Sequence, residues 1–275
     1  MDNLTAIVSA LFLPLATATL PIPLPLLSSF SVISTLHAIR VSFEYRNSLA
    51  HNHTRIGWLQ GAFAVCVIAG GGGSTAALIR GEPIGILKND LFFATYGLFY
   101  FLTFSNDLYY NAIRSIPSTV LQPVLIGADA LYRAFSIVSA GVDGVRSGEL
   151  GEGKWVAMVL CGTLAGAGGS VWADAFNLAQ HTWTFSTPQA FLSPNYEMRA
   201  AFFASLFYIL STSPELYPES LQKSVVLSRD DAKAWTALLL SCALIGKWGY
   251  NTFWVKGGNK LEGEIDEKEG KEKDE

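Results

Sequence analysis

The sequence has little charge, few cysteines and few histidines. Only 15% of its 275 residues are charged, against about 25% in a typical soluble domain, and 50% are hydrophobic. The three cysteines fall inside apolar runs, where a thiol behaves as a small hydrophobe, so neither a disulfide framework nor a metal-binding spacing is expected. The four histidines are scattered, and no nucleophile stands at a useful spacing from a base. The composition therefore indicates a membrane protein and not an enzyme.

The N-terminal segment is apolar but differs from a cleavable signal peptide. Asp2 stands where a signal peptide carries basic residues, and three prolines, at 21, 23 and 25, then interrupt regular structure. We expect residues 1–24 to form a partly helical lead segment that lies at the membrane interface. The first membrane helix is predicted from about Pro25 to Ile39, and a polar loop from Arg40 to Arg55.

Glycines interrupt the second apolar run, Ile56–Ile79. Gly70, Gly71, Gly72 and Gly73 lie at its centre, followed by Ser74, and each glycine costs a helix interior about 1 kcal/mol relative to alanine. We therefore predict a broken helix that lines a water-filled cavity. The alternative is close helix–helix packing through small residues, which is common in membranes.

A second copy of this pattern occurs later in the chain. The run 161–175 carries Gly166, Gly168 and Gly169 followed by Ser170, and Ala167-Gly168-Gly169-Ser170 matches Gly71-Gly72-Gly73-Ser74. Paired, glycine-interrupted apolar segments in two halves of a chain indicate a transport pathway. The sequence thus predicts a membrane transport protein.

The remaining apolar runs complete an all-α membrane fold. We expect seven transmembrane helices, arranged as one three-helix repeat at about 25–111, a second at about 117–210, and a seventh helix at about 232–254, so that the channel domain covers 25–254. A three-helix unit crosses the membrane an odd number of times, and its direct repeat must therefore insert upside down. The lysine- and glutamate-rich segment 257–275 is predicted to be a disordered tail.

Charged residues fall within the predicted fourth and fifth spans. Asp129 and Arg133 are four residues apart on the fourth helix and can pair across one turn, and Asp174 lies near the end of the fifth. Charges in a span usually face a pathway or the bundle interior; the alternative is a structural ion pair. The predicted pore-lining or gating residues are Gly70, Gly71, Gly72, Gly73, Ser74, Asp129, Arg133, Gly166, Gly168, Gly169, Ser170 and Asp174.

These features resemble the trimeric intracellular cation (TRIC) channels. The resemblance depends on Gly81-Glu82-Pro83 after the first glycine run, Asp107-Leu108-Tyr109-Tyr110 after the third helix, Arg133 in the fourth, and Gly166 and Gly168 in the fifth. It implies a homotrimer with one potassium-permeable pore per protomer, which supplies counter-ion flow in endoplasmic reticulum or nuclear membranes, or lies in the plasma membrane of a prokaryote. The implied partners are potassium ions, membrane lipids and other copies of the chain, with no nucleic acid.

The chain departs from the animal members of this family at the lipid site. There, the resemblance implies a lysine at the position of Asp129, which holds phosphatidylinositol bisphosphate together with the arginine at 133. Asp129 reverses that charge and leaves Arg133 as the remaining lipid-binding position, which argues against this lipid. The resemblance also implies basic residues at positions 136 and 165 of the animal members, where this chain has Ser136 and Ala165. We expect no cofactor.

A secondary transporter that binds a solute at the membrane midplane is the alternative function. The chain ends with Lys271 and Lys273 at spacings that resemble a dilysine retrieval signal, which predicts a cytoplasmic C-terminus. Seven spans then place Met1 in the lumen, with the sequons at Asn3 and Asn52 on opposite sides of the membrane.

Overall fold

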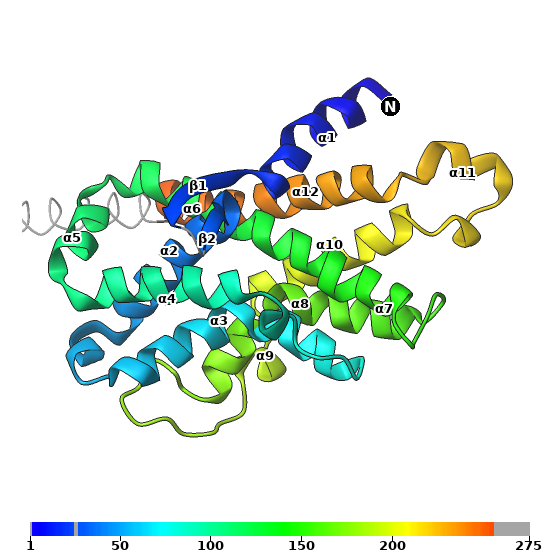
Figure 1. Ribbon diagram of the computed structural model, residues 1–275. Helices are drawn as coiled ribbons and strands as arrows, with labels where there is room; N and C mark the ends of the chain where they lie inside the picture. The colour runs from blue at the N-terminus through cyan, green and yellow to red at the C-terminus, as the bar shows by residue number, and fades with distance from the viewer. Residues whose placement is uncertain (1, 25–26, 256–275) are drawn as a thin grey trace, which may run out of the picture.

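The computed structural model describes residues 2–24 and 27–255, which form a helical bundle with one small hairpin (Figure 1). The main helices are α1 (Asp2–Thr17), α2 (Val32–Leu49), α3 (Trp58–Ile79), α4 (Asp90–Ser105), α5 (Asp107–Ser115), α6 (Ser118–Phe135), α7 (Asp143–Ser147), α8 (Trp155–Ala175), α9 (Gln189–Leu192), α10 (Tyr196–Ser211), α11 (Glu219–Val225) and α12 (Arg229–Gly249). Short 3₁₀ segments are η1 (Ala50–Thr54), η2 (Gly85–Lys88) and η4 (Pro214–Leu216), and π-helical segments are η3 (Ser136–Val142) and η5 (Tyr250–Val255). The predicted tail, 257–275, lies outside the described residues.

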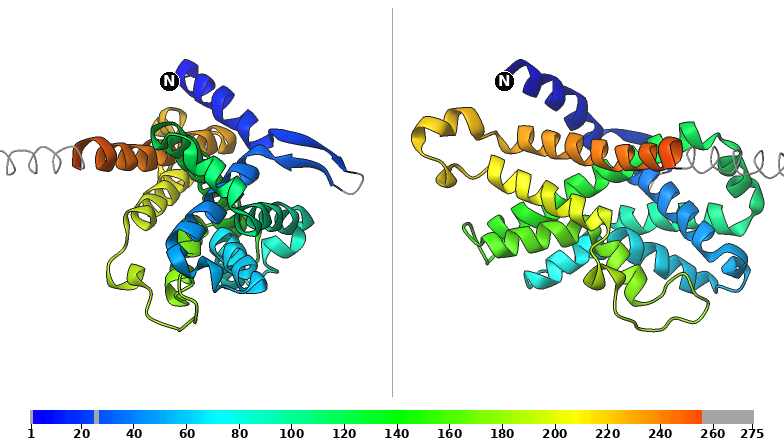
Figure 2. Two further views of the ribbon diagram at one scale, coloured as in Figure 1. Left: turned by 90° about the vertical axis from the view of Figure 1, so that its left-hand side faces the viewer. Right: turned by 180° about the vertical axis from the view of Figure 1, so that it is seen from behind.

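The N-terminal segment contains a hairpin that the sequence analysis did not predict. After α1, strands β1 (Thr19–Leu24) and β2 (Leu27–Ser31) pair antiparallel, and the hairpin extends away from the helices (Figure 2). Prolines are tolerated here because both strands are edges. The first long helix after the prolines consequently begins at Val32, where Ser31 caps it, and not near Pro25 as predicted.

The predicted polar loop from Arg40 to Arg55 is also wrong in its first part. Helix α2 continues to Leu49, because its polar residues recur at helical spacing. His37 and Arg40 are buried or half-buried on one face, and Glu44 lies one turn further on. Only the stretch after Leu49 leaves the helix, first as η1.

The predicted break at the glycines is not present. Helices α3 and α8 run without interruption through Gly70–Gly73 and through Gly166–Gly169. The physical reason is contact between the two helices: a Cβ atom added at Gly72 would lie 2.6 Å from the carbonyl oxygens of Leu164 and Ala165. The glycines therefore let two backbones touch, as in the packing alternative, and the interhelical contact offsets their poor helix propensity.

The other predicted apolar segments fall in helices. The third corresponds to α4, the sixth to α10 and the seventh to α12 with η5. Within residues 2–24 and 27–255, three helical stretches are apolar enough by length and composition to cross a membrane: Trp58–Ile79, Ser118–Ser147 and Trp155–Ala175. The second of these combines α6, η3 and α7. Within it, η3 directs Ile137, Val138 and Val142 into the core while Ser136 and Ser139 line a cavity.

Candidate functional site: two cavities on either side of the α3–α8 contact

Helices α3 and α8 cross where their glycine runs coincide. A Cβ atom added at Gly168 would lie 2.7 Å from the Cα of Gly72, and Gly168 holds the same place in the second glycine run as Gly72 in the first. Next to this contact the indole nitrogen of Trp172 donates a 2.7 Å hydrogen bond to the hydroxyl of Thr75. The centre of the bundle is therefore a backbone-to-backbone crossing of equivalent residues.

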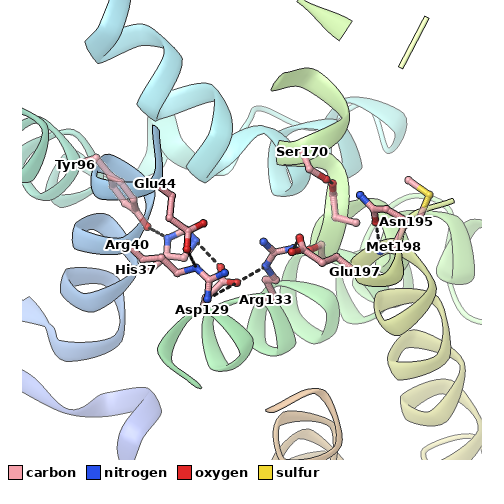
Figure 3. A network of polar contacts seen from close by, with 12 residues as sticks. His37, Arg40, Glu44, Tyr96, Asp129, Arg133, Ser170, Asn195, Glu197 and Met198 are labelled. Atoms are coloured by element: carbon pink, nitrogen blue, oxygen red, sulfur yellow. Dashed lines mark hydrogen bonds and ion pairs between the residues drawn. The ribbon is translucent and has the colours of Figure 1, made fainter. Parts of the chain in front are cut away.

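A first cavity, about 290 Å³ in volume, lies among α2, α3, α6, α8 and the start of α10. We call it the ion-pair cavity, because its charged lining residues are His37, Arg40, Glu44, Asp129, Arg133 and Glu197. Along α3 it contacts the middle of the helix, at Ile68, Ala69 and Gly72. Figure 3 shows that these charged side chains come from α2, α6 and α10 and point toward one another.

Asp129 is the centre of this network. Its side chain is 2% exposed and lies beside three groups: His37 Nε2 is 3.2 Å from Oδ1, Arg133 Nε donates to Oδ2 at 2.9 Å, and Arg40 Nη1 lies 3.7 Å from Oδ2 as an ion pair (Figure 3). A buried carboxylate is stable only when it is paired in this way. The predicted Asp129–Arg133 pair is present, and it is part of a larger network.

The two arginines also bind carboxylates that are more exposed. Arg133 Nη1 lies 2.7 Å from Glu197 Oε2 and donates to the carbonyl oxygen of Gly166 at 3.3 Å. Arg40 Nε lies 3.3 Å from Glu44 Oε1. The cavity thus contains three carboxylates and two guanidinium groups beside His37.

A second cavity, about 390 Å³ in volume, lies between α3, η2, α4 and η3. We call it the serine cavity, since Ser74, Ser136 and Ser139 line it. The Ser74 hydroxyl is buried and has no hydrogen-bond partner among the described residues. Along α3 this cavity reaches the C-terminal half, as far as Arg80.

Charged residues lie at the outer end of the serine cavity. Arg80 binds Glu82 through two parallel hydrogen bonds of 2.9 and 2.8 Å, and these bonds lower the pKa of the Glu82 carboxyl below its ordinary value. Arg80 also donates to the carbonyl oxygen of Ala140, so the turn after α3 is tied to η3. Lys88 adds a further cation to the lining.

Tyr132 and Ala69 line both cavities. The Tyr132 ring stacks on the imidazole of His37, with 4.0 Å between centroids and 10° between planes, and His37 Nδ1 lies 2.6 Å from the hydroxyl of Tyr96. His37 is therefore held between the Tyr132 ring and the Tyr96 hydroxyl. The stacked pair lies where the ion-pair cavity and the serine cavity adjoin each other beside the middle of α3.

The structure brings most of the predicted site residues to this region. Those that line the ion-pair cavity are Gly72, Asp129, Arg133, Gly166, Gly169 and Ser170, and those that line the serine cavity are Gly70, Gly73 and Ser74. Gly71 and Gly168 lie in the α3–α8 contact and line neither cavity. Asp174 is exposed at the end of α8, outside both cavities, and accepts from the backbone N–H of Gln189 at 3.3 Å.

Sequence reasoning missed five residues of the site: His37, Arg40, Glu44, Tyr132 and Glu197. The first three recur at helical spacing on one face, a signal that would have extended the first helix through the predicted loop. Tyr132 directly precedes Arg133 and carries no sequence signal of its own. Glu197 stands in the first turn of α10, where acidic residues are common for reasons unrelated to a pathway.

Comparisons with known proteins agree with this architecture. The TRIC channel family model matches residues 49–227. The chain is similar to a structure described as the structural basis for activity of TRIC counter-ion channels in calcium release, with TM-score 0.60 and 19% identity over 76% of this chain and 88% of the other. It is also similar to the structure of a trimeric intracellular cation channel from C. elegans with bound Ca²⁺. The TM-score is 0.63 and the identity 16%, over 89% of this chain and 96% of the other. For the C. elegans channel in the absence of Ca²⁺, the TM-score is 0.64 and the identity 16%, over 90% of this chain and 97% of the other. No curated protein sequence matches. Since the family model covers more than half of its length, the chain is a member of the TRIC channel family.

Proposed function

We propose that the chain forms a homotrimeric, potassium-permeable cation channel with one pore in each protomer. The observation that carries this proposal is the pair of adjoining cavities that meet at the middle of α3 and share Tyr132 and Ala69 in their linings. A route through both cavities would follow the bundle from end to end. The Tyr132–His37 stack would be its constriction.

The charges of the ion-pair cavity support permeation by cations. Three carboxylates face two guanidinium groups, so the lining has an excess of negative charge when His37 is neutral. Beyond the constriction, the hydroxyls of Ser74, Ser136 and Ser139 offer oxygen atoms that can replace part of a cation's hydration shell. The mechanism is passage of a partly hydrated cation past Tyr132, with Arg133 held aside by Asp129 and Glu197.

Seven spans with two inverted three-helix repeats remain the proposed topology. Contact between Gly72 and Gly168, equivalent residues of the two glycine runs, supports it, because equivalent residues meet where a two-fold axis passes between two repeats. Assembly as a trimer is proposed from the C. elegans neighbours, which are trimeric channels by name. We further propose an endoplasmic reticulum or nuclear membrane, a cytoplasmic C-terminus and a role in counter-ion flow. Members of this family are channels, and we propose no enzymatic activity.

Single-channel recording of the purified protein in planar bilayers tests the proposal. We expect unitary current steps, and a reversal potential near that of potassium when potassium chloride forms a gradient. Tyr132→Ala should raise the unitary conductance and Tyr132→Trp should lower it, because the side chain at position 132 sets the width of the proposed constriction. Tyr250→Ala is the matched control, since Tyr250 is 61% exposed and outside both cavities.

Two results would contradict the proposal. Solute flux without unitary steps would identify a carrier, the alternative function. A conductance that is the same in both Tyr132 variants and in the wild type would remove Tyr132 from the permeation route.

A further inference from the structure

A third polar cavity lies apart from the two already described, where α2 ends beside α5. Its volume is about 540 Å³, within the range of about 300–1,000 Å³ that is usual for small-molecule sites. The lining includes two guanidinium groups, of Arg46 and Arg114, and two imidazoles, of His51 and His53. No carboxylate lines it among the described residues. We call it the arginine cavity.

Arg46 is fixed by the protein itself. Its side chain is 5% exposed, donates to the carbonyl oxygens of Thr103 and Asn106 and to the carboxylate of Asp107, and lies 4.1 Å over the ring of Tyr110. Its charge is therefore balanced and its donors are used. Arg46 therefore forms a fixed floor, the buried side of the cavity, and its charge is balanced without a bound ligand.

The other donors of the cavity are not used in this way. Arg114, in the last turn of α5, makes no ion pair or side-chain hydrogen bond to any described residue. Asn47 accepts a 2.5 Å hydrogen bond from the hydroxyl of Tyr110 through its Oδ1 atom, which leaves both amide N–H groups available. The side chain of His51 is exposed and likewise makes no hydrogen bond within the described chain. The cavity thus offers several donors, one with a full positive charge, and few acceptors.

The cavity lies near the boundary of the membrane. Helix α5 connects α4, an apolar helix, to α6, which begins one of the three stretches apolar enough to span a bilayer, and Figure 1 shows α5 at the end of the bundle. Leu108 on α5 is 80% exposed, and the neighbouring Tyr109 and Tyr110 are of a residue type enriched at lipid headgroups. Phosphate groups of lipids are abundant at this level.

We propose that the arginine cavity binds a phosphate group, supplied by the headgroup of an anionic phospholipid or by a soluble phosphate compound. Arg114 supplies the charge, Asn47 and His51 supply further N–H donors, and Arg46 with Tyr110 holds the floor in place. The site is separate from the predicted lipid-binding position at Arg133, which is occupied by Asp129 and Glu197. It is also independent of the proposed function, because no residue of the arginine cavity lines either pore cavity.

Binding is measured on the full-length chain in detergent by native mass spectrometry. The probes are dioctanoyl phosphatidic acid, dioctanoyl phosphatidylcholine and inorganic phosphate. We expect phosphatidic acid to bind more tightly than phosphatidylcholine, and Arg114→Gln to raise its apparent Kd by about tenfold, the effect of losing one charge-assisted hydrogen bond. Arg55→Gln is the matched control, because Arg55 is an exposed arginine of the neighbouring segment that does not line the cavity.

The arms of the experiment separate the two sources of phosphate. Displacement of phosphatidic acid by inorganic phosphate, lost in Arg114→Gln, identifies a soluble phosphate compound as the ligand; no displacement identifies the lipid. Equal affinity for the two lipids, or an equal effect of Arg114→Gln and Arg55→Gln, would overturn the proposal. Glutamine at 114 stays on an exposed helical surface, and an unchanged thermal midpoint without lipid verifies that the variant is folded.

Discussion

The contact between α3 and α8 can be tested with two adjacent glycines. In Gly72→Ala the new Cβ atom lies 2.6 Å from two backbone carbonyl oxygens of α8, which cannot rotate away. In Gly73→Ala the nearest atoms are 3.6 Å and 3.8 Å distant, which is ordinary van der Waals contact. Both substitutions gain about 1 kcal/mol of helix propensity, so this gain cancels when the two variants are compared.

The difference that remains is the cost of overpacking, about 1–3 kcal/mol. Gly73→Ala should be as stable as the wild type or more stable, and Gly72→Ala should be less stable than Gly73→Ala by that amount. For a chain of this size, 1 kcal/mol shifts Tm by about 2–4 °C. The assay is thermal unfolding in detergent followed by the fraction of protein that still elutes as a single species.

A second pair provides the control for this comparison. Gly168→Ala meets the Cα of Gly72 at 2.7 Å and should behave like Gly72→Ala, whereas Gly97→Ala on α4 has no atom within 4 Å and should behave like Gly73→Ala. Equal Tm values for Gly72→Ala and Gly73→Ala would refute the close backbone contact and restore a looser, cavity-lining role for the glycines.

Three further predictions follow from the same structure and topology. Asp129→Ala removes the buried carboxylate that His37, Arg40 and Arg133 share and should cost about 3–5 kcal/mol, whereas Glu152→Ala removes a carboxylate that is 73% exposed and pairs with the exposed Arg229 and should cost about 1 kcal/mol or less; thermal unfolding compares them. A glycosylation assay should find Asn52 unmodified in microsomes, and a glycan there would reverse the proposed topology. Changing Lys271 and Lys273 to Ser should move the protein from the endoplasmic reticulum toward the cell surface in fluorescence microscopy, and an unchanged distribution would eliminate the retrieval signal.

The apolar helices could be located from the sequence because their composition decides where they form. The segments assigned to α4, α8 and α10 each lie within a few residues of the observed bounds, since long apolar runs between polar turns have few other structures available in a membrane. The prolines of 21–25 were read correctly as an interruption. The structure that forms there in place of a helix, a hairpin before Val32, depends on pairing between β1 and β2, which has no strong turn signal in the sequence.

The predicted helix break at the glycines is wrong because helix propensity describes a single segment and does not include contact with a second helix. Taken alone, Gly72 weakens a helix; in contact with the backbone of α8 it permits an approach that any larger residue would prevent. The charged cluster was incomplete for a similar reason. Asp129 and Arg133 are neighbours on one helix and could be paired from spacing, but His37, Arg40 and Glu197 come from other helices and meet them only in the folded chain.

The π-helical segment η3 determines how the next helix, α7, is rotated about the shared helix axis. One residue corresponds to about 100° of turn in an α-helix, so the wider winding of Ser136–Val142 sets the direction in which α7 presents its side chains. Asp143 accepts from the Tyr208 hydroxyl at 2.7 Å, and Arg146 donates to the Ser213 hydroxyl at 2.9 Å. Deleting one residue of η3 would rotate both anchors away from α10 and its following turn. The length of η3 therefore fixes how α7 is rotated about the helix axis, and the hydrogen bonds of Asp143 and Arg146 constrain that length.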